Sequence, residues 1–253
     1  MRPPIATIPA PPFPDGAEWI NSAPLHLERN PPAALLVEFW DFCRVNSLRT
    51  LPYLRAWHER YADAGLRVVG AHAAGFEPSR DPAQVRAAVG RLSIEYAVML
   101  DERFELWRAY GIEGWPSRYL FDDRLMLVDF HVGEGGYAGT ELALQRLLDV
   151  QRKPLAPLRP EDDDGAELVP QSSDVDGPWS GAYAAGAVWA VLEGDGVARA
   201  NGRTVRVTDP GCYPLVEHPH HTEATLELEL DAGVACHAVC FTPGLARAAP
   251  AAD

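Results

Sequence analysis

The chain has 253 residues with 47% hydrophobic content, which suits two modest folded domains and argues against disorder. Its net charge of −14 disfavours nucleic acid and anionic membrane surfaces as partners, because both favour basic patches. No segment has the length and apolar character of a signal peptide or a membrane span, so we expect a soluble, cytoplasmic protein.

Strands and helices alternate through the first half of the chain. A buried apolar strand is predicted at 35–39, followed by a helix at 46–64 that carries one apolar stripe and ends at Gly65. The further predicted elements are strands at 66–72 and 96–100, helices from 81 and at 102–110, strands at 118–121 and 125–132, and a helix at 141–150. This order predicts an α/β fold with a mixed central sheet flanked by helices.

The second half of the chain has a different pattern. Prolines and the acidic run 161–164 mark a linker, and short alternating stretches after it predict a small all-β sandwich domain without helices. The predicted organisation is an extended lead-in at 1–16, an α/β domain at 17–150, a linker at 151–170, a β-sandwich domain at 171–247 and a tail at 248–253.

The segment 40–47 reads Trp-Asp-Phe-Cys-Arg-Val-Asn-Ser and joins the first strand to its helix. Several further sequence segments belong to the same pattern and lie in its order along the chain, at 18–22, 36–40, 48–54, 110–111, 115–120 and 133–135. Together they resemble the thioredoxin-like domain of the TlpA/DipZ class of AhpC/TSA-type redoxins. The segments 212–216 and 233–242 resemble the carbohydrate-module-like β-sandwich domain that follows it in DipZ-type proteins. The resemblance implies a thioredoxin fold in the first half.

The same resemblance aligns Arg44 with the attacking cysteine of the Cys-x-x-Cys pair and Ser47 with the resolving one. An arginine cannot attack a disulfide and a serine hydroxyl cannot resolve a mixed disulfide, so dithiol exchange is not expected. Cys43 is the remaining catalytic candidate, since the charge of Arg44 favours a thiolate. The alternative is that Cys43 is a small buried residue of the loop.

Three further positions correspond to parts of the active site in that class. Glu38 aligns with the buried carboxylate that accepts a proton beneath the dithiol, although we favour an ion pair between Glu38 and Arg44. Trp115 and Pro116 align with the cis-proline loop, whose backbone pairs with extended substrates; a turn that only shapes the fold is the alternative. Trp40, Trp115 and Pro116 are therefore binding candidates.

Other clusters carry less information. Cys236 and Cys240 are about 13 Å apart along one predicted strand, too far for a disulfide, whereas pairing of either with Cys212 stays open. The histidines of 218–221 fit a polar loop better than a metal site, so no metal and no cofactor are expected. Trp179 and Trp189 fit either sugar stacking or a sheet core.

Three hypotheses follow. The first is a redoxin-like protein that uses Cys43 as a single thiol in mixed-disulfide formation or thiol sensing, with a protein thiol as partner; if it is an enzyme, it is a thiol–disulfide oxidoreductase or an antioxidant-type redoxin. The second is a non-catalytic module that binds a peptide or small molecule beside Pro116, with a β domain that binds carbohydrate. The third is a scaffold in which the β domain supplies a dimer or partner surface.

Overall fold

The computed structural model describes residues 7–247, and its contacts divide the chain into two compact units, Met1–Ala156 and Pro157–Asp253. Part of the predicted lead-in, 1–6, and the predicted tail, 248–253, lie outside the described residues. Within 7–247, no helix is long and apolar enough to cross a membrane.

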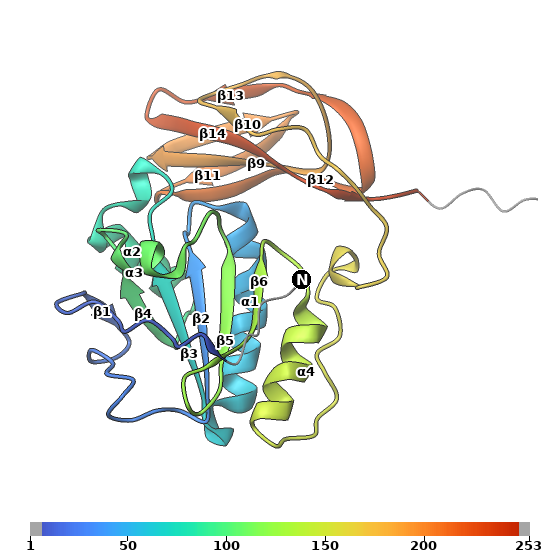
Figure 1. The fold of residues 1–253 in the computed structure, drawn as a ribbon. Helices are drawn as coiled ribbons and strands as arrows, with labels where there is room; N and C mark the ends of the chain where they lie inside the picture. The colour runs from blue at the N-terminus through green and yellow to red at the C-terminus, as the bar shows by residue number, and fades with distance from the viewer. Residues whose placement is uncertain (1–6, 248–253) are drawn as a thin grey trace, which may run out of the picture. The chain divides into compact units, whose positions relative to one another are not determined.

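The first unit is built on a six-stranded mixed sheet in the order β1-β4-β3-β2-β5-β6 (Figure 1). Its strands are β1 (Trp19–Ile20), β2 (Ala34–Trp40), β3 (Leu66–His72), β4 (Ala97–Leu100), β5 (Ser117–Phe121) and β6 (Leu127–Val132). Strands β2, β3 and β4 are parallel, whereas β5 and β6 form an antiparallel hairpin beside β2. The predicted α/β fold with a mixed central sheet is confirmed.

The helices of this unit are α1 (Val45–Tyr61), α2 (Pro82–Arg91), α3 (Glu105–Tyr110) and α4 (Tyr137–Leu147), with short 3-10 turns η2 (Ala62–Ala64) and η3 (Glu77–Ser79). As predicted, the first helical segment ends at Gly65, which adopts a left-handed conformation with φ of 98°. Several boundaries differ from the sequence prediction, most of all the starts of two helices. Helix α3 begins three residues later than predicted, after Phe104 at φ 56°, and α4 begins four residues earlier, directly after Gly136 at φ 62°.

Strand β2 lies at the centre of the sheet and is buried along its whole length. Its residues alternate between the two faces of the sheet: Leu35, Val37 and Phe39 join a core cluster with Leu106 of α3, so Glu38 and Trp40 face the opposite side. The neighbouring strand has Gly70 in register with Glu38. A Cβ atom on Gly70 would lie 2.8 Å from Trp40 Nε1, so the missing side chain makes room for the Trp40 ring.

The second unit consists of strands in the described residues, apart from one 3-10 turn, η4 (Pro160–Asp162). The strands are β7 (Leu168–Val169), β8 (Val175–Asp176), β9 (Gly181–Gly194), β10 (Gly196–Ala200), β11 (Arg203–Val207), β12 (Gly211–Leu226), β13 (Leu228–Leu230), β14 (Val234–Thr242) and β15 (Gly244–Leu245). They form sheets in the orders β12-β9-β14-β8, β11-β10-β13 and β15-β7. The predicted all-β character is confirmed.

The core of this unit draws on alternate residues of β9, including Val188, Ala190 and Leu192, together with Val239 and Phe241 of β14. One prediction is wrong here: the histidines of 218–221 do not form a loop between strands. They lie inside the long strand β12, where the pairing with β9 shifts register between Glu217 and Thr222. The irregularity lets polar residues extend the strand where a turn was expected.

Candidate functional site

The loop between β2 and α1 is fastened by Asp41, a fully buried residue. Its Oδ1 accepts a hydrogen bond from the Cys43 backbone N–H at 2.8 Å, and its Oδ2 accepts one from the Gly75 N–H at 2.7 Å. The Asp41 N–H donates to Ser47 Oγ at 3.2 Å. The carboxylate therefore ties this loop to the segment after β3, and Ser47 supports it from the first turn of α1.

Arg44 is the N-cap residue of α1, and its side chain lies between two aromatic rings. The guanidinium carbon is 4.4 Å from the centre of the Phe76 ring and 4.7 Å from that of Trp115. Nη2 donates a long hydrogen bond of 3.5 Å to the Gly75 carbonyl, whereas Nε is buried without a hydrogen bond. The structure thus brings the Arg44 side chain against Trp115. The peptide bond between Trp115 and Pro116 is cis.

The Trp115 ring is fixed on its other sides as well. Its Nε1–H donates to the Ala73 carbonyl at 2.9 Å, and its ring centre is 4.4 Å from that of Trp107. The paired register of β5 with β6 begins at Ser117 opposite Val132, so the backbone of Trp115 lies before the ladder. The Trp115 ring is thus held by contacts on several sides, and its main chain lies outside the sheet.

Cys43 and Ser47 are both buried, with 0% and 1% of their surface exposed. A reactive thiol needs access as well as a neighbouring charge. Cys43 lies next to the charged Arg44 in sequence, but its side chain points into the protein. The burial therefore favours the interpretation of Cys43 as a small residue of the loop.

Glu38 faces the interior, and burial raises the pKa of its carboxyl from 4.5 to about 7. The predicted ion pair with Arg44 is wrong, because Arg44 stacks on Phe76 and Trp115, and neither Glu38 oxygen has a hydrogen-bond partner. The positive charge that partly offsets the desolvation comes from Arg118, which lies opposite Glu38 in the β2–β5 register.

Trp40 follows Glu38 on the same face of β2 and is also fully buried. Its ring packs edge-to-face on His72, with the ring centres 5.3 Å apart. Among the predicted binding candidates, Trp115 is partly buried beside Arg44, whereas Pro116 and Trp40 are buried.

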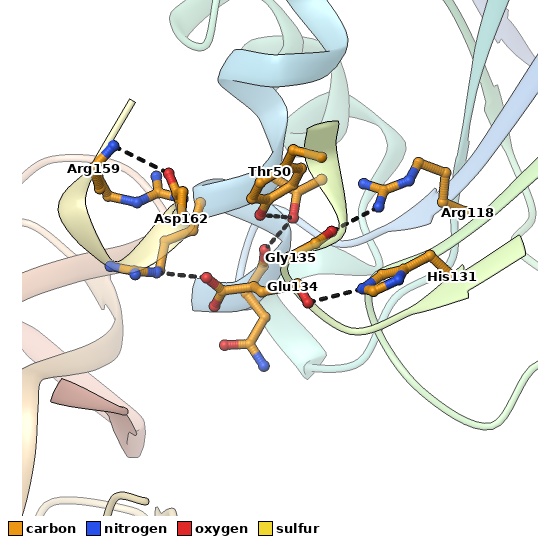
Figure 2. A network of polar contacts seen from close by, with 10 residues as sticks. Thr50, Arg118, His131, Glu134, Gly135, Arg159 and Asp162 are labelled. Atoms are coloured by element: carbon orange, nitrogen blue, oxygen red, sulfur yellow. Dashed lines mark hydrogen bonds and ion pairs between the residues drawn. The ribbon is translucent and has the colours of Figure 1, made fainter. Parts of the chain in front are cut away.

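The loop from β6 to α4, residues 133–136, is held by side chains from three elements (Figure 2). The Glu134 carboxylate pairs with Arg49 of α1 at 2.7 Å. The backbone carbonyl of Glu134 accepts a hydrogen bond from His131 Nε2 at 2.9 Å. Arg118 Nη2 donates to the Gly135 carbonyl at 2.8 Å. These bonds connect the start of α4 to α1 and to the strand that carries Arg118.

Sequence reasoning did not identify Asp41, Phe76 or Arg118 as parts of this site. Arg118 had a signal, because pairing the predicted hairpin beside the first strand places it near Glu38. Asp41 directly follows the strand and was visible as a polar residue in an apolar run. Phe76 had none, since its contact with Arg44 joins residues 32 positions apart through loop geometry.

The cysteines of the second unit are not in disulfides, and neither is Cys43. Cys212 belongs to β12, whereas Cys236 and Cys240 belong to β14, and β9 lies between these strands. Strands two positions apart in a sheet are separated by about 9.5 Å, which exceeds the Cα separation that a disulfide spans. The pairing left open by the sequence is therefore not formed.

The aromatic candidates of the second unit take different positions. Trp179 packs on the core and meets Phe241 edge-to-face at 5.9 Å, whereas Trp189 is partly buried on β9. His218 Nε2 lies 2.9 Å from the Tyr183 hydroxyl. Within 7–247, no three histidine, cysteine or acidic side chains gather as metal ligands do. Sugar binding by this unit stays a prediction.

Solved structures define the fold class of the first unit. A crystal structure of a thioredoxin-like superfamily protein matches 58% of this chain and 99% of its own with a TM-score of 0.52 and 19% identity. A solution structure of a thioredoxin-like protein in the oxidised form matches 57% and 97% with a TM-score of 0.50 and 24% identity. The first unit therefore has the thioredoxin-like fold that the sequence predicts.

Several curated proteins are similar to part of this chain. The chain is 27% identical over 158 residues to Protein DipZ of Mycobacterium tuberculosis, a match covering 61% of this chain and 23% of DipZ. It is 32% identical over 126 residues to the Arabidopsis thaliana chloroplast protein SUPPRESSOR OF QUENCHING 1, covering 49% and 12%. Bos taurus NHL repeat-containing protein 2 is 30% identical over 128 residues, covering 49% and 18%. The match thus spans less than a quarter of each relative, and no protein-family model matches the chain.

Proposed function

We propose that the first unit is a redoxin-like binding module that holds a peptide or small molecule beside Trp115 and Pro116 and does not exchange dithiols. The observation that carries this proposal is the position of Arg44. Its guanidinium stands at the N-terminus of α1, where the resemblance expects the attacking thiol, and faces the loop that carries the cis-proline.

The chemistry of Arg44 and its surroundings supports binding over redox catalysis. A guanidinium is not a nucleophile, and it presents several N–H donors in a fixed plane that suit a carboxylate or a backbone carbonyl. The N-terminus of α1 adds its partial positive charge, and its first turn contains no acidic residue, although the Asp41 carboxylate lies just before it. The Trp115 main chain, which lies before the β5–β6 ladder, can pair with an extended segment.

A selection of random peptides on phage against the full chain tests this proposal. Enriched peptides, retested by fluorescence polarisation, should bind the wild-type protein and lose about tenfold in affinity on Arg44→Ala, which corresponds to one lost charge-assisted hydrogen bond. The matched control is Arg124→Ala, which removes an arginine that is 74% exposed on the β5–β6 hairpin. Absence of enriched peptides, or equal losses in both variants, would overturn the proposal.

The single-thiol hypothesis makes a different prediction for the same protein. If Cys43 forms mixed disulfides, glutathione disulfide should modify it rapidly in the folded chain. We expect instead that Cys43 is modified only when the protein is unfolded, because its side chain is fully buried. Mass spectrometry of the native protein and of the protein in denaturant distinguishes the two, and a rapid adduct confined to Cys43 would favour the redox role.

A further inference from the structure

Three residues with ionisable side chains follow one another across neighbouring strands of the first unit. Glu38 of β2 is opposite Arg118 of β5, and Arg118 is opposite His131 of β6. Opposed residues of antiparallel strands lie on the same face of the sheet, with Cβ atoms about 4.5–5.5 Å apart. Figure 2 shows that Arg118 and His131 each bond to the loop 133–136. The row therefore joins the buried Glu38 to that loop.

The middle residue of the row, Arg118, is 2% exposed and bonds to the loop through one nitrogen atom. Nη2 donates to the Gly135 carbonyl at 2.8 Å, whereas Nε and Nη1 are buried without a hydrogen bond. Both carboxyl oxygens of Glu38 are also buried without one. With Nη2 at Gly135, the guanidinium thus makes no hydrogen bond to Glu38, although unused donors and unused acceptors lie on neighbouring strands. Buried polar groups are normally satisfied, so this arrangement has a competing alternative in which Arg118 bonds to Glu38.

The charge of Glu38 decides between the two arrangements. A neutral carboxyl attracts a guanidinium weakly, so the bond to the Gly135 carbonyl is retained. An ionised carboxylate is a stronger acceptor than a carbonyl, and a buried charge without a partner is costly. Burial raises the pKa of Glu38 to about 7, even though the charge of Arg118 lowers it, so both forms are populated near neutral pH.

Other ionisable side chains approach Glu38, Arg118 or the adjacent Trp40 from the remaining elements of this face. They are Tyr96 before β4, Arg55 of α1, His72 of β3 and Tyr137 of α4. Burial and the Glu38 charge raise the pKa of Tyr96, so its hydroxyl stays protonated. Arg55 is exposed, and His72 Nε2 is 3.7 Å from Asp41 Oδ1. Arg118 is therefore the cation that an ionised Glu38 attracts.

We propose that ionisation of Glu38 draws the Arg118 guanidinium from the Gly135 carbonyl to the Glu38 carboxylate and thereby releases the loop 133–136. Glu38 gives up one proton to solvent, and one charge-assisted hydrogen bond replaces another. The Gly133 N–H donates to the Pro116 carbonyl at 2.8 Å, so the released loop is the one that supports Pro116. A pH dependence of ligand binding beside Pro116 follows. That last step rests on the function proposed above, whereas the exchange of hydrogen bonds does not.

NMR spectroscopy of the isotope-labelled full chain, without any ligand, tests the exchange between about pH 5 and pH 9. The resonances to follow are the Arg118 Nε–H and the backbone amides of Gly133, Gly135 and Gly136. In the wild-type protein they should shift together in one transition with a midpoint near pH 7, where Glu38 ionises. Glu38→Gln should abolish the transition, because a glutamine of the same shape does not ionise and leaves Arg118 at Gly135.

The matched control is His131→Gln, because His131 Nε2 lies 2.9 Å from the Glu134 carbonyl and is a second titratable group at this loop. The transition should be retained in this variant. Three results would overturn the proposal: no shift of the Arg118 Nε–H near pH 7, loop amides that do not move with it, or a transition that survives Glu38→Gln. The wild-type titration decides the first two even if a variant does not fold.

The same data separate this proposal from the function proposed for the first unit. A shared transition in a protein that selects no peptide would contradict peptide binding beside Trp115 and leave the exchange at Arg118 intact. Peptide binding in a protein without the transition would do the reverse.

Discussion

Arg44 occupies the position where the resemblance expects the attacking cysteine. Its guanidinium lies over Phe76 on one side and Trp115 on the other, and each such contact stabilises by about 0.5–1 kcal/mol at accessible sites. The side chain is therefore held in one place rather than left mobile at the helix N-terminus. A Cβ atom on Gly75 would lie 2.7 Å from Arg44 Nε, so a larger residue there would displace the arginine side chain.

Glu38 is a buried acid that lacks the ion pair expected from the sequence. The nearest compensating charge belongs to Arg118, yet burial still raises the pKa of Glu38 to about 7. An acid of this kind destabilises the folded state when it ionises.

The raised pKa of Glu38 predicts a specific dependence of stability on pH. Below about 4.5 the carboxyl is neutral in both the folded and unfolded chain, so it has no effect. Between about 4.5 and 7 only the unfolded chain ionises, and the free energy of unfolding falls as pH rises, by about 3 kcal/mol once pH exceeds 7.

Glu38→Gln should remove this slope and make the protein more stable than the wild type above pH 7. Urea unfolding at several pH values checks it, with Glu77→Gln as a control because that glutamate is 72% exposed. A wild-type stability that rises from pH 5 to pH 8 with the same slope in both variants would show that Glu38 is ionised throughout.

At the scale of elements, the site depends on how α1, β5 and the loop 133–136 are joined. Arg118 donates to the Gly135 carbonyl and Arg49 pairs with Glu134, while the rings of Tyr53 and Tyr137 stack with centres 3.7 Å apart. These contacts fix where α4 begins, one turn earlier than its sequence pattern indicates.

The Arg49–Glu134 pair provides a test of that connection. Its side chains are only 11% and 20% exposed, so solvent screens the pair less than a surface pair. A double-mutant cycle with alanine at both positions should give a coupling energy of about 1 kcal/mol in urea unfolding. The same cycle on Arg80 and Glu77, which are largely exposed, should give a coupling near zero. Equal couplings would mean that the loop contact adds no more than a surface pair.

Elements with a strong pattern could be predicted from the sequence, and elements with irregular ends could not. Strand β2 is a continuous apolar run and α1 has a clear stripe and a glycine stop, so both were recognised. The predicted start of α3 is too early because Phe104 adopts φ of 56°. This left-handed conformation is rare for phenylalanine, so the sequence gives no signal for it. The 16-residue strand β12 was missed because its bulge carries the histidines.

At the scale of the whole molecule, the positions of the site followed from the resemblance, but its contacts did not. Alignment placed Arg44 and Ser47 at the start of the helix and Trp115–Pro116 across from it. Arg44 contacts Phe76 and Gly75, and both residues belong to the loop that follows β3. From charge alone, Glu38 is the expected partner of Arg44, but its carboxylate faces the interior.

The two units also differ in whether a candidate site can be assigned to them. The thioredoxin-like fold of the first unit gives each candidate residue a geometric role, whereas the all-β unit is defined by its core and has no assigned site. The proposed function therefore depends on one proposition: Arg44 and Ser47 occupy, within a thioredoxin-like fold, the two positions that the resemblance assigns to reactive cysteines.

The most direct measurement is insulin reduction in the presence of dithiothreitol by the double variant Arg44→Cys, Ser47→Cys. We predict that the wild-type chain leaves the reaction at its uncatalysed rate, as does Ser47→Cys alone, whereas the double variant accelerates it. Acceleration by the wild-type chain, or a double variant that is folded by circular dichroism and inert, would contradict the account.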